Sequence, residues 1–405
     1  MGLFSFFGKK TTRAEFAQIV IDAMRARGES APITFDEATF ALRVGDTDPK
    51  EVVNLGNFFH QYEQAPRGER ANVVTGFLRS LGGTKRARPK WSEAQHRLLP
   101  HLRGRCYWSF SALSARANGI EPFLEPLRLF GADAGIGLVL DYPDMMSTAG
   151  PSHLAEWGID AESAFVTALA NLRARTESRF RRANRGVHVS LWKDTYDAAR
   201  ILLPDLIAAL PVRGRHVALI PNRDLLILTG DADVDGLTAA AKLAESALDE
   251  AQAISARPLV FEDGDWQPFA LPPEHPAAAA YALLAIQQTK GEYDEQKELL
   301  NAVHAKEDDP PFVASFSGTR APDATVTSFC SWTEGIAQLL PKTDSIGFVR
   351  VHGTDAKMLG FARWDDVAKL DGLSLKETGD YPPRFIASGF PTDAQLRALP
   401  LRDTP

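Results

Sequence analysis

Three polar side chains that can bind a ligand are grouped between two apolar segments. Asn222, Arg223 and Asp224 separate the apolar runs 216–220 and 225–229. The proline and asparagine between these runs favour turn dihedrals, so we predict a β-hairpin that exposes the three side chains at its tip. Hydrogen-bonding groups on a loop of a rigid scaffold often bind ligands. The alternative is ordinary turn chemistry, with Arg223 paired to a nearby acid.

Two further carboxylates lie where predicted strands end. Asp141 follows the apolar run 136–140, and Asp231 follows the second strand of the hairpin. If the hairpins stack side by side, Asp141, Asp224 and Asp231 converge on one edge of a sheet. Converging carboxylates support acid–base catalysis, with or without a divalent cation. The sequence does not set their separation, so this hydrolase-like site is a hypothesis.

An arginine-rich stretch suggests a different ligand. Arg175, Arg179 and Arg182 have the i, i+4 and i+7 spacing of one helix face. With aromatic residues nearby, such a face is suited to an anion or a nucleic acid. The alternative is a solvated helix end, where cations complement the helix dipole. Nucleic acid is the less favoured partner because the formal net charge is -7.

Signature motifs of common enzyme classes are missing from the sequence. It has no phosphate-binding glycine loop in the right position, no G-x-S-x-G and no H-E-x-x-H. Its two cysteines, Cys106 and Cys330, form no C-x-x-C pair, so we expect neither a zinc knuckle nor a dithiol centre. Arg103 and Arg105 would favour a Cys106 thiolate, but a free cysteine is usually a buried apolar residue. We expect no cofactor and no metal.

Composition indicates a soluble globular protein. The chain has 405 residues, 44% hydrophobic and 24% charged, and two lone thiols fit the reducing cytoplasm. We find no window of about 18 uncharged apolar residues, so no membrane span is expected. Near the start, Leu3, Phe4, Phe6 and Phe7 either adhere weakly to a membrane or form a frayed or docked segment. The sequence specifies neither a protein partner nor the oligomeric state.

Apolar periodicity predicts the elements that would position these residues. Helices are expected at 16–28, 73–81, 91–102, 160–172, 198–210 with a break at Pro204, 237–248 with Asp235 as cap, 277–288, 294–304 and 333–340. Residues 54–62 are expected to be a strand end that runs into a helix. Strands are expected at 33–44 as a pair, 106–113, 136–142, 216–220, 225–229, 259–269 as a hairpin, 312–316, 326–331, 346–352 and 358–363.

The order helix, strand, strand, helix recurs about three times before residue 270. Adjacent hairpins predict antiparallel sheets, and therefore an α+β fold of repeated modules. Proline-containing breaks divide the chain into an N-terminal α+β module at 1–84, a central α+β region at 91–271, and a helical linker with a small C-terminal α+β unit at 272–405.

The central region resembles the YtpQ-like bacterial proteins, known as domain of unknown function 1444. The resemblance covers about two-thirds of the chain and rests on motifs in a particular order. These are Leu138-Val-Leu-Asp-Tyr-Pro, Trp157-Gly-Ile-Asp leading to Ala170-Asn-Leu, Leu202-Leu-Pro-Asp-Leu and Ile220-Pro-Asn-Arg-Asp-Leu-Leu, with Leu55-Gly-Asn-Phe-Phe-His-Gln-Tyr in front. Residues after about 290 depart from the pattern. The resemblance implies a bacterial cytosolic protein and transfers no activity or catalytic residue.

These observations favour a non-catalytic binding or regulatory protein, because the layout is modular and catalytic signatures are missing. Two alternatives stay open at this point. One is a hydrolase-like enzyme that uses the strand-end carboxylates, and the other is nucleic-acid or anion binding through the arginine-rich stretch.

Overall fold

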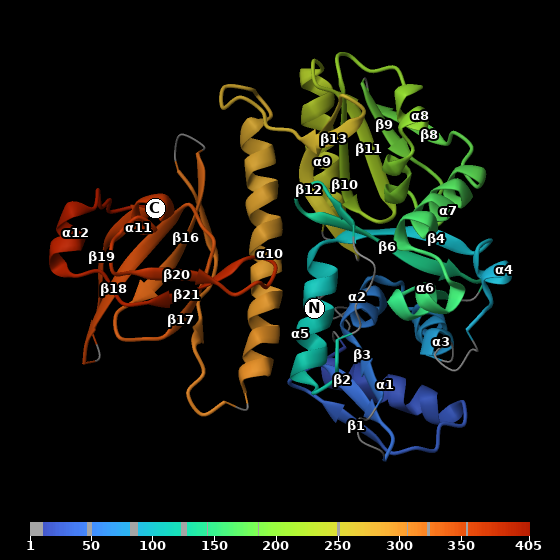
Figure 1. Ribbon diagram of the computed structural model, residues 1–405, viewed down its shortest axis with the longest axis horizontal. Coiled ribbons are helices and arrows are strands. Elements are labelled where there is room, and N and C mark those ends of the chain that lie inside the picture. The colour runs from blue at the N-terminus through green and yellow to red at the C-terminus, as the bar shows by residue number, and fades with distance from the viewer. Residues whose placement is uncertain are drawn as a thin grey trace, which may run out of the picture. The chain divides into compact units, whose positions relative to one another are not determined.

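The computed structural model confirms an α+β fold (Figure 1). It describes residues 11–46, 51–81, 88–122, 128–143, 145–184, 186–248, 252–305, 307–321, 325–353 and 355–405, so the apolar residues of the first ten positions lie outside the described part. The chain forms two compact units. The first holds residues 1–100, 118–126 and 138–174, and the second holds 101–117, 127–137 and 175–405. Across the described residues, no helix has both the length and the apolarity that a membrane crossing requires.

The first unit begins with an antiparallel meander covered by helices. Its elements are α1 (Arg13–Ala26), β1 (Ile33–Asp36), β2 (Ala41–Val44), β3 (Glu51–Asn54), α2 (Gly56–Gln64) and α3 (Arg70–Leu81), with sheet order β1-β2-β3. A capping box of Thr12 and Glu15 starts α1. Phe16, Leu42 and Leu55 are fully buried in the core between these elements. The predicted helices and strands of this segment are confirmed.

The remainder of the first unit is built around α7 (Ala161–Ala174). The Asn171 amide donates to the carbonyls of Gln95, at 2.6 Å, and Leu98, at 2.8 Å, and so joins α7 to the turn after α4 (Trp91–Ala94) and to the start of the strand that follows it. Asp160 caps α7 as predicted, accepting a hydrogen bond from the Ser163 N–H at 2.7 Å. The other elements are α6 (Pro151–Trp157), β7 (Met146–Thr148) and portions of β4 (Leu98–Gly104) and β6 (Ala134–Asp141).

Two elements that precede β6 contradict the expected secondary structure. The helix predicted at 91–102 ends at Ala94, and residues 98–104 form β4 instead, paired with β6 in the sheet order β4-β6-β5 with β5 at Arg128–Phe130. Every residue of β4 is buried, so its apolar run carries no period, and Pro100 is incompatible with a helix interior. The strand predicted at 106–113 is the helix α5 (Cys106–Ala117), which buries residues 106, 113 and 117 at helical spacing.

The second unit contains a six-stranded antiparallel sheet. Its order is β13-β12-β10-β11-β9-β8, formed by β8 (Phe180–Asn184), β9 (Val187–Ser190), β10 (His216–Asn222), β11 (Leu225–Gly230), β12 (Ala253–Glu262) and β13 (Asp265–Pro268). Helix α9 (Val234–Leu248) packs its apolar stripe on this sheet. The hairpin predicted at 216–229 is therefore confirmed. The cap of α9 is Asp233 and not Asp235, because the Gly236 N–H donates to the Asp233 carboxylate at 2.8 Å.

A single helix replaces the two helices predicted after the proline-rich break. Helix α10 (Ala278–His304) runs through Gly291 without interruption and lies beside α5 (Figure 1). Tyr281, Leu284, Tyr293 and Leu300 are buried along its length, so packing on both sides of Gly291 outweighs the poor helix propensity of glycine.

The C-terminal part of the second unit packs two four-stranded sheets over one core. One sheet has the order β14-β17-β21-β20, formed by β14 (Phe312–Val313), β17 (Gln338–Pro341), β20 (Ser374–Glu377) and β21 (Arg384–Ser388). The other has the order β15-β16-β18-β19, formed by β15 (Ser317–Arg320), β16 (Val326–Thr333), β18 (Ser345–His352) and β19 (Asp355–Arg363). Short helices α11 (Trp364–Val367) and α12 (Asp393–Ala398) complete the core around Trp332. The helix predicted at 333–340 is wrong, because its last residues belong to β17.

Arg384 joins α10 to this C-terminal sandwich. Its guanidinium is fully buried, and it donates to the Gln296 side chain at 2.6 Å and to the carbonyls of Ala314 at 2.8 Å and Leu339 at 3.1 Å. A weaker bond reaches the Tyr293 carbonyl, and the cation lies over the ring of the same residue. Burial lowers the Arg384 pKa to about 10, so the group stays charged near neutral pH. The charge is therefore satisfied by neutral acceptors.

We predict that Arg384→Met lowers the free energy of unfolding by about 3 kcal/mol or more, because buried acceptors without donors each cost about 1–3 kcal/mol. Chemical denaturation followed by tryptophan fluorescence measures this difference. Arg402→Met, at an exposed side chain of the same unit, serves as the control and should change stability by less than about 0.5 kcal/mol. Equal losses in the two variants would contradict the assigned role of Arg384.

Candidate anion-binding site

The tip of the β10–β11 hairpin is less exposed than its sequence suggests. Asn222 is only 1% exposed; its amide donates to the Ala247 carbonyl at 3.0 Å, and its side-chain oxygen accepts from the Asp224 N–H at 3.0 Å. Asn222 therefore builds the turn and does not reach out to a ligand. Arg223 is one-fifth exposed and pairs with the half-exposed Asp224 at 3.2 Å. The tip presents one cation and one anion on its surface.

The proposed convergence of strand-end carboxylates is wrong for Asp224 and Asp231. They lie at opposite ends of β11, which separates them by roughly 20 Å at about 3.3 Å per residue. Asp231 accepts hydrogen bonds from Arg215, at 2.8 Å from the backbone N–H and 2.7 Å from Nε, and so closes the hairpin. Asp141 ends β6 in the other compact unit, where its N–H donates to the Arg97 carbonyl at 2.9 Å.

The arginine-rich stretch does not form a helix face. Helix α7 ends at Ala174, Arg175 follows in a turn, and Arg182 lies in the edge strand β8. The stretch has helical spacing but extended backbone, so its side chains cannot share one stripe. Arg179 lies 3.8 Å from the exposed Glu177 carboxylate, which is a surface pair of small energetic weight. The anion patch predicted from Arg175, Arg179 and Arg182 is therefore not assembled.

A different cationic group, which the sequence did not indicate, is buried close to the hairpin tip. His101 and Arg103 are two residues apart on β4, so their side chains leave the strand on the same face. Each is 7% exposed. Within the described part of the chain, both ring nitrogens of His101 and the Nε of Arg103 have no hydrogen-bond partner. Buried polar groups are nearly always paired in folded proteins, so three unpaired atoms in one place require an explanation.

Backbone contacts bring four segments together at this point. A Cβ at Gly104, the residue after Arg103, would lie 3.1 Å from the Ile254 carbonyl, so the end of β4 passes directly against β12. The Arg223 N–H donates to the Gln252 carbonyl at 3.2 Å, immediately before β12. The Arg223 carbonyl in turn accepts from the Ala198 N–H at 3.1 Å, at the start of the 3-10 helix η2 (Ala198–Leu202). The ring of Tyr107, in the first turn of α5, lies 5.5 Å from the His101 ring.

The charges at this site would attract an anion. Burial and the nearby Arg223 lower the Arg103 pKa to about 10, while Tyr107, Asp224 and Tyr196 act in the opposite direction. Arg103 is therefore a cation near neutral pH. Burial, with smaller contributions from Arg103 and Arg223, lowers the His101 pKa well below its usual value, so the imidazole is neutral. The site consists of two guanidinium cations, one neutral imidazole and the Asp224 carboxylate at its rim.

Among the described residues, two arginines that are even more deeply buried than Arg103 have well-satisfied guanidinium groups. Arg200 donates from both terminal nitrogens to the Asp194 carboxylate, at 2.8 and 2.6 Å, and from Nε to the Thr176 hydroxyl at 3.0 Å. Arg384 uses Nε and both terminal nitrogens, as described above. Arg103 donates from one terminal nitrogen to the carbonyl of Leu102, at 3.2 Å, and its Nε is unpaired. Arg103 is thus the exception among comparable side chains.

A strained loop packs beside this site. Lys193 and Thr195 have φ values of 54° and 70°, a conformation that is costly for a β-branched residue such as threonine. The Asp197 carboxylate accepts from the Trp192 N–H at 3.1 Å, and Asp194 holds Arg200. These bonds fix the loop that carries Tyr196, which acts electrostatically on Arg103. Strained backbone of this kind is concentrated at functional sites.

A second buried polar cluster joins α5, α10 and β12. Asp133, 4% exposed, pairs with Arg257 and accepts from the Ser255 and Tyr381 hydroxyls, each at 3.1 Å. Glu292 of α10 accepts from the Gln288 amide at 2.7 Å and hydrogen-bonds the Cys106 thiol. Burial, with smaller contributions from nearby carboxylates, raises the Cys106 pKa far above its ordinary value, so the thiol is not a nucleophile. The cluster is internally paired, and its half-exposed member Arg257 is already bonded to Asp133.

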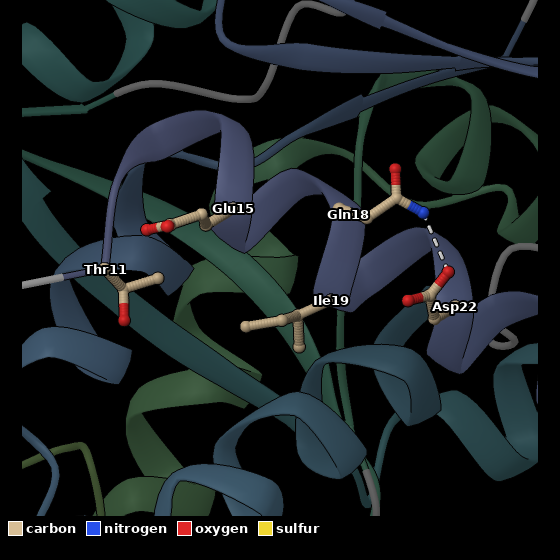
Figure 2. A pocket seen from close by; sticks show the side chains of 5 residues that line it. All are labelled: Thr11, Glu15, Gln18, Ile19 and Asp22. Atoms are coloured by element: carbon tan, nitrogen blue, oxygen red, sulfur yellow. Dashed lines mark hydrogen bonds between the residues drawn. The ribbon is translucent and has the colours of Figure 1, made fainter.

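Other surface features carry less chemistry. The hollow in Figure 2 is lined by Thr11, Glu15, Gln18, Ile19 and Asp22, and the last four lie along one face of α1. Gln18 donates to Asp22 at 2.7 Å across this face, and Glu15 is used in the helix cap. Among the residues that the structure describes, no group of three or more histidine, cysteine or carboxylate side chains is arranged to hold a metal ion.

Comparisons with known proteins add no evidence on function: no family model matched the chain, and the curated proteins and the solved structures gave no significant match. Membership of the YtpQ-like family therefore stays a prediction from sequence.

We predict that Arg103→Met leaves the free energy of unfolding unchanged or raises it by up to about 4 kcal/mol in the absence of a ligand. Replacing a poorly paired buried charge by an apolar side chain of similar volume removes a desolvation cost. Denaturant titration beside Arg384→Met is the measurement, because the same substitution there should destabilise. A loss of stability in Arg103→Met as large as in Arg384→Met would mean that the protein itself satisfies Arg103.

We predict that Glu292→Gln becomes increasingly stabilising between about pH 4.5 and pH 7. Burial, as the main cause, and Asp133 raise the Glu292 pKa to about 7, above its ordinary value of 4.5, so the native protein binds a proton that the unfolded chain releases. The stability that this proton gives is complete below pH 4.5 and is lost as the pH rises through 7. The neutral glutamine does not undergo that loss. The free energy of unfolding of Glu292→Gln therefore rises relative to that of the wild type, by a few kcal/mol at most.

Melting temperatures at several pH values test this prediction, with the exposed Glu298→Gln on the same helix as control. If the difference in melting temperature between Glu292→Gln and the wild type does not depend on pH, the pKa of Glu292 is not raised.

Proposed function

We propose that this protein is a non-catalytic binding protein whose ligand carries an oxyanion, a phosphate, sulfate or carboxylate group, that binds between Arg103, His101 and Arg223. The observation that carries the proposal is the unpaired Nε of the buried, charged Arg103 next to two unpaired imidazole nitrogens. A guanidinium offers five donors in a planar fork that matches the oxygens of such a group. The partly exposed Arg223 and Asp224 form the side of the site that solvent reaches.

The arrangement supports binding more than catalysis. Asp224, the carboxylate at the rim, is paired with Arg223, and His101 is kept neutral mainly by burial, with smaller contributions from the two cations. The separation of Asp224 from Asp231 removes the acid–base pair on which the hydrolase alternative depended. Anion binding is retained from the sequence-based hypotheses, but it moves from the arginine-rich stretch to residues on β4 and the hairpin tip.

Thermal unfolding in sulfate and in phosphate, compared with chloride at equal ionic strength, tests the proposal. A ligand that binds the native state alone stabilises it by about 2.7 kcal/mol at a hundred times its dissociation constant, which raises the melting temperature by several degrees. We expect this rise in the wild type and a much smaller one in Arg223→Gln, which removes the accessible cation.

Arg215→Gln is the matched control, since Arg215 precedes β10 at the end of the strand opposite to Arg223 and forms exposed ion pairs with Asp231 and Glu262. Its loss should cost a little stability and leave the response to sulfate intact. Identical melting curves in sulfate and chloride, or the same response in Arg223→Gln as in the wild type, would contradict the proposed function.

A further inference from the structure

The anion site contains a histidine whose placement suggests how binding is regulated. The His101 ring is buried on β4, on the same face as Arg103, and both of its nitrogens are unpaired within the described residues. A neutral imidazole has one donor and one acceptor, whereas an imidazolium has two donors. An oxyanion beside Arg103 would supply acceptors that only the protonated ring uses fully.

The surroundings of His101 oppose its protonation unless an anion is bound. Arg103 on its own strand and Arg223 from the hairpin tip are the charged groups that act on the ring, and both are cations. Tyr107 and Trp108 of α5 contribute ring contacts at 5.5 and 6.5 Å. Asp224 and Tyr196 act electrostatically on Arg103, in the direction opposite to Arg223. A proton on His101 would therefore be a third buried positive charge until an anion arrives.

We infer that the site takes up its oxyanion together with one proton, which His101 accepts from solvent and returns when the anion leaves. This inference rests on the proposed function, because it concerns the same site. With the proton, a doubly charged group such as sulfate or a phosphate monoester meets three cations and one carboxylate, which leaves the site neutral. Without the proton, the same group would leave a net negative charge among buried residues, which is costly. The site therefore favours dianions at lower pH.

Titration calorimetry with sulfate, in two buffers of different ionisation enthalpy, counts the protons taken up. Sulfate is the probe because it does not titrate near neutral pH. We expect close to one proton per sulfate at about pH 7, and a dissociation constant that rises up to tenfold per pH unit. His101→Gln should bind sulfate more weakly, with proton uptake near zero. His216→Gln is the control, because His216 contacts the Leu210 carbonyl at the far end of β10; its uptake should match the wild type.

The ring nitrogen chemical shifts of His101 in the wild-type protein provide a second measurement that does not depend on a variant's folding. They should change from neutral to imidazolium values when sulfate is added. Sulfate binding without proton uptake, or with unchanged ring shifts, would overturn the inference and leave the proposed function in place. The absence of sulfate binding would overturn both.

Discussion

A buried guanidinium must have acceptors, and this requirement links the parts of the second compact unit. Arg384 obtains its acceptors from α10 and the C-terminal sandwich, and Arg200 obtains them from the strained loop before η2. In both places the acceptors come from segments far apart in the sequence or from a loop that has no regular structure of its own. The cation thereby determines which segments lie together. Arg103 is 7% exposed, nearly as buried as these two, but it lacks such a set of acceptors, and this difference is the basis of the functional proposal.

Several features that shape the site cost free energy, among them strained backbone and a buried charge. The loop that carries Tyr196 contains two residues with positive φ, Lys193 and Thr195. The side chain of Asn222 stabilises the hairpin turn through its own hydrogen bonds. The β4 strand is buried along its whole length, so a charge on it cannot reach water by a change of rotamer alone. Proteins commonly give up some stability at binding sites in this way, and a ligand restores it. The anion and the proton on His101 are the components that would complete the site.

Local patterns in the sequence predicted much of the fold but little of the site. The β10–β11 hairpin, the Asp160 cap and most C-terminal strands follow from turn residues and alternation, which act over a few positions. The β4 strand and α5 were predicted with the wrong structure, because a strand buried on both faces has no period and an aromatic-rich helix resembles a strand. His101 was overlooked and Arg103 was considered only as a neighbour of Cys106, because the sequence does not show which polar residue of a buried strand will lack a partner. The predicted hairpin tip includes Arg223 and Asp224 of the proposed site, although Asn222 has a structural role.

The most direct test of this account is a crystal structure of the wild-type protein grown with selenate, whose selenium atom is located by anomalous scattering. We expect a selenium peak within hydrogen-bonding reach of the Arg103 Nε and the His101 ring, on the side towards Arg223. A site without anomalous density, in which the Asp224 carboxylate or another protein group is bonded to the Arg103 Nε, would contradict it.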